Sequence, residues 1–247
     1  MTDTERKDAS AATRAALEAA RADLPRDDGE DFRLADRGFI ATLPDADIPG
    51  AWSLKPYAFL QGEAAPTVHP ALWRQAQLNL RHGLFEVTPG VYQVRGFDIS
   101  TVTFIEGERG YIVIDPLTSA QPARTALELM RAHRGDRPVT AVIYTHSHVD
   151  HYGGILGVAS PEEIAAGLPI IAPEGFLKEA VSENVLAGNA MSRRATYMYG
   201  ALLPKDPRGH VDSGLGKGVS GGKVALVPPT VSISRTGERL VVDGVRV

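Results

Sequence analysis

An apolar run over residues 139–144 is the clearest indication of the fold class of this chain. Its sequence, Val-Thr-Ala-Val-Ile-Tyr, is apolar at nearly every position and rich in β-branched side chains, and Pro138 precedes it. A strand buried on both faces has this composition, whereas a strand with one wet face alternates apolar and polar residues. The run therefore predicts a buried strand in an α/β sheet that helices cover.

A dense cluster of metal-binding side chains follows this strand directly. Its members are His146, His148, Asp150 and His151. Because residues two apart in an extended chain point the same way, His146 and His148 can hold one metal together. Asp150 and His151 fall on the next turn and can face a second metal, while Gly153-Gly154 lets the backbone pass close by without a Cβ clash. The carboxyl end of a strand is where open α/β sheets usually place their sites.

This cluster predicts hydrolytic chemistry. Two metals about 3.5–4 Å apart hold a bridging water, lower its pKa towards neutrality and polarise an anionic substrate. The nucleophile is then a hydroxide, and no side-chain nucleophile is needed. The chain contains no cysteine, which excludes a thiolate zinc site, a cysteine nucleophile and a disulfide framework.

Neighbouring patterns place the cluster in a βαβ unit. Strand-like runs lie around Tyr92 and over residues 101–105 and 111–114, and we expect them to form the hairpins of a first sheet. Residues 121–133 have helical spacing and would cross over to the strand at 139–144. Further short strands are expected at residues 168–172, 223–227, 231–234 and 240–242.

Other helices are expected on both sides of this unit. One covers residues 10–24 and is stopped by Pro25, and another follows the capping-box sequence Ser-Pro-Glu-Glu at 160–163. Residues 174–186 should also be helical, and the pattern can extend to Tyr199. Composition divides the chain into an N-terminal extension (1–30), an arm that wraps the core (31–89) and a domain that carries the cluster (90–247).

The residues at 146–151 resemble the signature of the metallo-β-lactamase superfamily. The surrounding sequence is more specific, because LWRQAQLNLRHGLFEVTPGVYQVRGFDISTVTFIEGERGYIVIDPLTS and AVIYTHSHVDHYGGILGV are similar to the alkylsulfatases, in the linear primary alkylsulfatase branch. The similarity runs from about Phe32 to the last residue. It implies an αββα sandwich with one or two zinc ions at the edge between its sheets.

The resemblance also implies that this chain is the N-terminal portion of a longer enzyme. A dinuclear site needs about six or seven protein ligands, of which the cluster supplies four. In the alkylsulfatases the others are two glutamates and a histidine further along, followed by a dimerisation region and a sterol-carrier-like domain. We therefore expect two Zn²⁺, an alkyl sulfate substrate, a homodimer of the longer protein and, in this chain, a sandwich truncated after its first half.

Further residues are candidates for roles around the metals. Asp115 ends a strand and can accept a hydrogen bond from a ligand histidine. Sulfate recognition needs fixed donors, for which Arg194, Tyr199 and Lys217 are candidates, with an exposed helix face and a flexible glycine-rich loop as the alternative. His210 has the spacing of a third metal-binding histidine in short hydrolases of this fold, with a surface loop histidine as its alternative.

Composition excludes some classes of function. The net charge of −4 argues against a nucleic-acid surface, which normally has a basic patch. No apolar segment typical of a signal peptide occurs in residues 1–30, and no run of 18 apolar residues predicts a membrane span. A cytoplasmic location is the default expectation, although the resembling family is often periplasmic.

Three functional hypotheses follow. The leading one is hydrolysis of primary alkyl sulfate esters, such as dodecyl sulfate, to alcohol and sulfate through two zinc ions. The second is a compact hydrolase of another ester or thioester, with His210 completing the first metal site. The third is a truncated, catalytically silent zinc-binding fragment.

Overall fold

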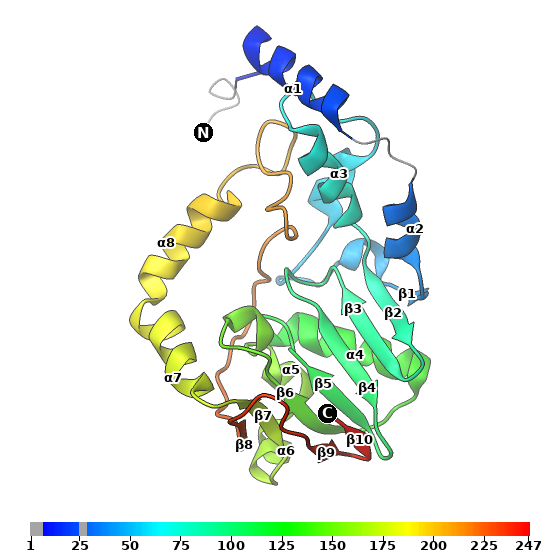
Figure 1. Ribbon diagram of the computed structural model, residues 1–247, viewed down its shortest axis with the longest axis vertical. Helices are drawn as coiled ribbons and strands as arrows, with labels where there is room; N and C mark the ends of the chain where they lie inside the picture. Colours follow the sequence, from blue (N-terminus) through cyan, green and yellow to red (C-terminus); the bar gives the residue numbers. More distant parts are fainter. Residues whose placement is uncertain (1–6, 25–28) are drawn as a thin grey trace.

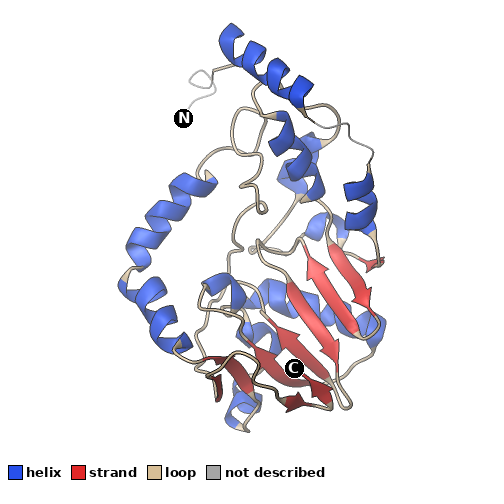
Figure 2. Ribbon diagram, in the orientation of Figure 1, coloured by secondary structure: helices blue, strands red, loops and turns tan. Residues whose placement is uncertain are grey.

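A mixed β-sheet forms the centre of the molecule (Figures 1 and 2). The computed structural model describes residues 7–24 and 29–247. Within these residues eight strands form one sheet in chain order. They are β1 (Phe39–Ala41), β2 (Gly83–Thr88), β3 (Val91–Arg95), β4 (Val102–Glu106), β5 (Tyr111–Ile114), β6 (Val139–Ile143), β7 (Ile170–Pro173) and β8 (Val231–Ile233). Neighbours pair antiparallel from β1 to β5 and parallel from β5 to β8.

The predicted βαβ unit is confirmed, and it determines where the site lies. Helix α4 (Ala120–Arg134) connects β5 to β6 and packs its buried side chains into the hydrophobic core. Because the two strands run parallel with Ile114 opposite Ile143, their carboxyl ends meet at one edge of the sheet. The Asp115 N–H donates to the Ile143 carbonyl at 2.9 Å. Side chains that follow β5 therefore lie beside those that follow β6.

The predicted close passage at the glycine pair is also confirmed. A Cβ on Gly154 would lie 2.0 Å from the Pro116 carbonyl oxygen, and one on Gly153 would lie 2.2 Å from that of Thr118. These contacts let the short helix α5 (Ile155–Val158) pack against α4. Glycine at both positions thus holds the loop after β6 against the loop after β5.

The N-terminal region contributes to the same sheet. Helix α1 (Ala11–Asp23) begins at Ser10, which accepts the Thr13 N–H, and Pro25, predicted to stop it, lies outside the described residues. Helices α2 (Glu30–Asp36) and α3 (Pro70–Leu78) and the 3₁₀ turns η2 (Pro44–Ala46) and η3 (Lys55–Leu60) follow. β2 forms a hairpin with β3, and the boundary expected at residue 89 lies at the turn between these two strands.

A helical arm follows β7 and runs away from the sheet (Figure 1, yellow). It consists of α7 (Phe176–Val181), the π-helix η5 (Ser182–Leu186) and α8 (Gly188–Tyr199), as the pattern over residues 174–199 predicts. The capping box is confirmed at α6 (Pro161–Ala165), where both of its hydrogen bonds are present. No helix in the described residues is long and apolar enough to cross a membrane.

The C-terminal residues differ from expectation. The strand predicted at residues 223–227 is wrong, because this segment packs apolar side chains on the core and pairs with no strand; the Ala225 N–H donates to Gly153. β8 confirms the strand near residue 231. β9 (Val241–Val242) confirms the last predicted strand, but it pairs with β10 (Val245–Arg246) in a hairpin.

Candidate metal centre

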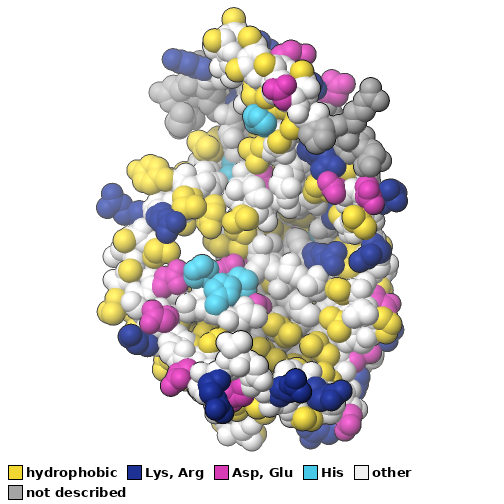
Figure 3. All heavy atoms as spheres, in the orientation of Figure 1, with side chains coloured by type: hydrophobic (Ala, Val, Ile, Leu, Met, Phe, Trp, Pro, Cys, Tyr) yellow, Lys and Arg dark blue, Asp and Glu magenta, His cyan; other side chains and the backbone are white. Residues whose placement is uncertain are grey.

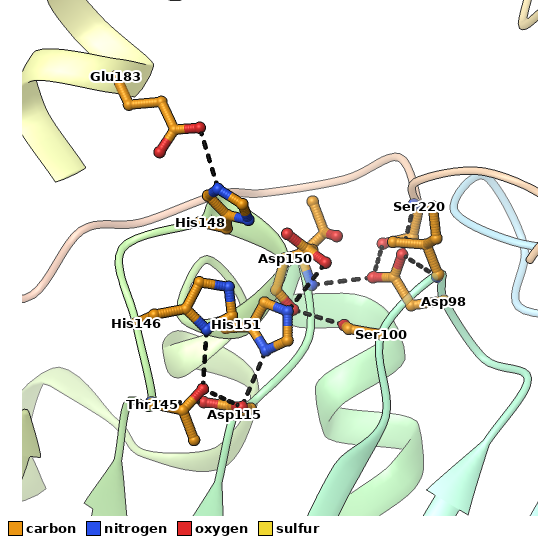
Figure 4. Close-up of polar contacts among 12 residues, drawn as sticks. Asp98, Ser100, Asp115, Thr145, His146, His148, Asp150, His151, Glu183 and Ser220 are labelled. Atoms are coloured by element: carbon orange, nitrogen blue, oxygen red, sulfur yellow. Dashed lines mark hydrogen bonds and ion pairs between the residues drawn. The ribbon is translucent and has the colours of Figure 1, made fainter. Parts of the chain in front are cut away.

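The histidine cluster lies on the loop between β6 and α5 (Figure 4). The ring centroids of His146 and His151 are 4.0 Å apart, and those of His146 and His148 are 4.7 Å apart. The backbone allows this because the 3₁₀ turn η4 (Val149–His151) brings the last histidine back towards the first. Figure 3 shows the histidines together at the surface beside acidic side chains. The three predicted imidazole ligands are therefore neighbours in space.

Asp115 and Asp150 hold His151 from its two sides. The Nδ1 atom of His151 lies 2.8 Å from Asp115 Oδ2, and its Nε2 atom lies 3.2 Å from Asp150 Oδ2. Burial alone would lower the pKa of His151, but the hydrogen bonds to Asp115 and Asp150 outweigh it and raise the pKa to about 9. Asp115 has a left-handed φ of 55°, a conformation that aspartate tolerates better than most residues.

Thr145 determines the orientation of His146. The Thr145 hydroxyl donates to Asp115 Oδ2 at 2.7 Å and lies 3.0 Å from His146 Nδ1. Since its one proton is already donated, the hydroxyl accepts a hydrogen bond from Nδ1–H of the histidine. The Nε2 lone pair of His146 is then free. Burial and the neighbouring rings of His151 and His148 lower the pKa of His146.

His148 is the most exposed ring of the cluster. Its side chain is 58% exposed, and its Nε2 atom lies 3.4 Å from Glu183 Oε1 on η5. The neighbouring Asn184 donates to the Ser147 carbonyl at 3.3 Å. The π-helix of the arm therefore contacts two adjacent residues, Ser147 and His148, of the loop at residues 145–151. This loop carries the predicted metal ligands and is called the ligand loop below. Sequence reasoning missed Glu183 and Asn184, because no pattern in residues 182–186 indicates a π turn.

The donor set fits zinc in kind. Imidazole nitrogens and carboxylate oxygens are common zinc ligands, and in each ring one nitrogen faces a neighbouring oxygen outside the predicted ligand set. The oxygens belong to Thr145 for His146, to Glu183 for His148 and to Asp115 for His151. The opposite nitrogens are the candidate donors. As they stand, the described residues contain no three His, Asp or Glu side chains arranged as a finished metal site.

A buried carboxylate ties the glycine-rich segment 214–222 to the site. Asp98 accepts hydrogen bonds from the backbone N–H of Thr118 and from both the N–H and hydroxyl of Ser220. Burial raises its pKa. Nearby, the Ser100 hydroxyl donates to the Asp150 carbonyl oxygen (Figure 4). The loop after β3 thus supports the ligand loop, a role that its sequence did not reveal.

Lys217 does not match its predicted role as a sulfate donor. Its side chain is 2% exposed, and Nζ lies 2.7 Å from Asp212 Oδ2. The remaining N–H groups donate to the carbonyl oxygens of Ala76 and Val211. Because an ammonium group has three donors, none is left for a substrate. This lysine anchors the glycine-rich segment to Ala76, Val211 and Asp212.

His210 belongs to the same buried cluster and not to the metal centre. The ring is 3% exposed, so the alternative of a surface loop histidine is wrong as well. Its Nδ1 atom lies 2.9 Å from the Tyr57 hydroxyl, and burial lowers its pKa. Among the described contacts none joins His210 to residues 146–151. It therefore does not complete a metal site in this structure.

The two remaining sulfate candidates lie on α8. Arg194 is exposed on this helix, and Tyr199 at its end lines a cleft of about 620 Å³ together with His210 and Arg208. Neither residue has a described contact with the histidine cluster. The structure thus brings together the four predicted ligands and Asp115, and leaves Arg194, Tyr199 and Lys217 apart from them.

Comparisons with known proteins agree with this geometry. The sequence profile of the metallo-beta-lactamase superfamily matches residues 95–240. A linear primary-alkylsulfatase from Pseudomonas sp. is 53% identical over 246 residues, covering 96% of this chain and 36% of that protein. An alkyl/aryl-sulfatase from Saccharomyces cerevisiae is 48% identical, covering 94% of this chain and 37% of its own length.

A solved structure of an alkylsulfatase is also similar to this chain. The stereoselective inverting sec-alkylsulfatase Pisa1 from Pseudomonas sp. superimposes with a TM-score of 0.93 at 45% identity, covering 98% of this chain and 39% of that one. The chain spans little more than a third of the length of these relatives. The predicted α/β fold class and the predicted similarity to alkylsulfatases are confirmed. This chain belongs to the metallo-β-lactamase superfamily.

Proposed function

We propose that this chain supplies metal ligands to a site that hydrolyses primary alkyl sulfate esters to an alcohol and sulfate. The observation that supports this most is the surface cluster of His146, His148, Asp150 and His151, in which one nitrogen of each imidazole faces an oxygen outside the predicted ligand set. The identity of 53% to a linear primary-alkylsulfatase indicates the substrate class. Dodecyl sulfate is the test substrate.

Two zinc ions are the proposed cofactor, with the four cluster residues as part of their ligand set. When bound, zinc would activate water and neutralise negative charge on the sulfate. The protein's part is to prepare the donor atoms. Asp115 faces His151 Nδ1 and Thr145 faces His146 Nδ1, so that the Nε2 atom of each ring is the one that would bind zinc.

Substrate recognition is proposed to involve the helical arm. Arg194 and Tyr199 stay the candidates for contacts with the sulfate, because α8 continues from the π turn that contacts the ligand loop. We leave Lys217 out, since its donors are used within the protein. A homodimer of the longer protein stays a prediction from the resemblance.

The test combines metal content with sulfate release. We expect the purified 247-residue chain to bind zinc, measured by elemental analysis after dialysis, and to release sulfate from dodecyl sulfate far more slowly than ordinary enzymes, which turn over at roughly 1–10³ per second. A protein of the relatives' full length that begins with this chain should reach that range. A chain that binds no zinc would refute the proposed metal centre.

Assays with different substrates distinguish the sulfatase from the two alternative functions. A zinc-loaded long form that cleaves carboxylic esters or thioesters but not dodecyl sulfate would point to another hydrolase. A zinc-loaded long form that cleaves none of them would point to a silent zinc-binding protein. Either result would overturn the sulfatase assignment while leaving the metal site intact.

A further inference from the structure

The π-helix η5 is the point where the arm contacts the ligand loop. π-Helices are rare, and short ones often lie at functional sites. Here the wide turn is closed by the Ala187 N–H, which donates to the Ser182 carbonyl at 2.9 Å. Within the turn, Glu183 faces the ring of His148 and Asn184 donates to the Ser147 carbonyl. Figure 4 shows Glu183 reaching down from the helix to His148.

The contact determines which nitrogen of His148 is free. A carboxylate oxygen that faces Nε2 favours the tautomer with the proton on that atom, and the lone pair is then on Nδ1. Asp115 faces the other ring nitrogen, Nδ1, of His151. The two carboxylates therefore prepare opposite nitrogens on His148 and His151.

His148 needs such a partner more than its neighbours do. Its side chain is 58% exposed, whereas the His151 side chain is 22% exposed. An exposed imidazole can turn freely unless a hydrogen bond or a packed neighbour holds it. Glu183 is 24% exposed, and Asn184 is tied to the Ala180 carbonyl at 3.0 Å as well as to Ser147. The π turn thus offers a fixed acceptor.

We propose that Glu183 is a positioning residue, which holds His148 with Nε2 protonated so that Nδ1 is the atom offered to the metal. This inference rests on the proposed metal centre. It also makes the arm part of that centre, since the carboxylate that faces His148 is carried by η5. A surface ion pair contributes little to stability, because solvent screens its charges. The effect of Glu183 should therefore show in metal binding and not in unfolding.

The experiment compares three variants with the unchanged chain. Glu183→Ala removes the acceptor, Glu183→Gln keeps an oxygen that can accept from Nε2–H, and Glu179→Gln changes an exposed glutamate of α7 that is 59% exposed beside Lys178. The Zn²⁺ dissociation constant is measured by chelator competition. Thermal unfolding of the metal-free proteins reports the fold.

We expect Glu183→Ala to bind Zn²⁺ about 10–100-fold more weakly, with an unchanged unfolding midpoint. Glu183→Gln should recover most of the affinity, and Glu179→Gln should match the unchanged chain. Long-range ¹H–¹⁵N spectra of the zinc-loaded chain should show His148 protonated at Nε2 and metal-bound through Nδ1. The visible spectrum of the Co²⁺-substituted protein should change in Glu183→Ala.

Three outcomes would overturn the inference. The first is wild-type Zn²⁺ affinity and an unchanged Co²⁺ spectrum in Glu183→Ala. The second is Glu183→Gln binding as weakly as Glu183→Ala. The third is His148 bound to zinc through Nε2. In each of these cases the unchanged chain still binds Zn²⁺, so the proposed metal centre survives. An unchanged chain that binds no Zn²⁺ refutes both proposals.

Discussion

Two polar clusters of this molecule contain histidine, yet they differ in exposure and in how their donors are used. At the ligand loop, His148 is 58% exposed and one nitrogen of each ring faces an oxygen outside the predicted ligand set. Around Lys217, the charged groups are at most 2% exposed and satisfy one another. The first arrangement leaves prepared lone pairs at the surface, which suits metal binding. The second holds two segments of the chain together.

The buried cluster connects regions that are distant in sequence. Lys217 pairs with Asp212, which also accepts the Asn79 side-chain amide at 3.0 Å, and Lys217 Nζ lies 5.0 Å from the Tyr57 ring centroid. These contacts join the region of η3 and α3 to residues 210–217. A basic residue in a glycine-rich loop is therefore not by itself a sulfate site, because burial decides whether its donors are free.

The largest effect on bound zinc should follow from removing the exposed imidazole of His148. His148→Ala takes away a proposed metal ligand, so we expect the zinc bound after dialysis to fall well below that of the unchanged chain. The unfolding midpoint of the metal-free protein should stay the same, because an exposed side chain contributes little to stability. Elemental analysis and thermal unfolding check this pair of results. Unchanged zinc stoichiometry would remove the central distinction between the clusters.

A change in the buried cluster should lower stability and leave zinc binding unchanged. Lys217→Met leaves Asp212 buried without its partner, which should lower the free energy of unfolding by about 3–5 kcal/mol. Zinc content per folded chain should stay the same. Urea unfolding without metal measures the first quantity, and Lys178→Met, at a side chain that is 85% exposed, is the control with little expected change. Loss of zinc without loss of stability would place Lys217 in the metal centre.

A substitution at Asp115 tests whether a residue that does not bind the metal can still raise its affinity by orienting the ring of His151. Asp115→Asn tolerates the left-handed φ of 55° but does not place a carboxylate beside His151 Nδ1. We expect Zn²⁺ affinity to fall about 10–100-fold. Chelator competition measures this, with Asp136→Asn, at a side chain that is 91% exposed, as the control. Equal affinities in the two variants would mean that His151 needs no such partner.

The smallest effect concerns a buried carboxylate outside both clusters. Asp243 is 1% exposed, lies 2.9 Å from Arg109 Nε and accepts the Gly110 N–H at 2.9 Å. Burial alone would raise the pKa of Asp243, but the hydrogen bonds from Arg109, Gly110 and Thr140 outweigh it and lower the pKa below the usual aspartate value. Asp243→Asn should cost about 1–2 kcal/mol of unfolding free energy at neutral pH, with zinc content unchanged.

The pH dependence of this difference has a definite sign. Because the folded pKa lies below the unfolded value, the carboxylate contributes its full stability at pH values above the unfolded pKa and loses it as the pH falls through the folded pKa. Urea unfolding of both proteins at neutral pH and at lower pH values should show the difference shrinking below that point. A difference that grows on acidification would contradict the assignment.

Local sequence patterns were enough to predict much of the fold around the site. The run at residues 139–144, the helix before it and the glycine pair each predict one element, and all three are present because their causes are local: buried apolar periodicity, and close backbone approach. The hairpin at β9 and β10 was missed, although its turn at Asp243-Gly244 is the dipeptide most typical of two-residue hairpins. The apolar run there had indicated a single strand.

The candidate metal donors at His146, His148, Asp150 and His151 lie within six consecutive residues, so their identity and spacing could be read from the amino-acid sequence, and the βαβ pattern was enough to place Asp115 at the same edge. The fold was needed to learn which oxygens face the ring nitrogens, that Lys217 and His210 are buried together, and that Glu183 faces His148. These features depend on burial and on contacts between segments far apart in the chain, as Glu183 and His148 or Tyr57 and His210 are.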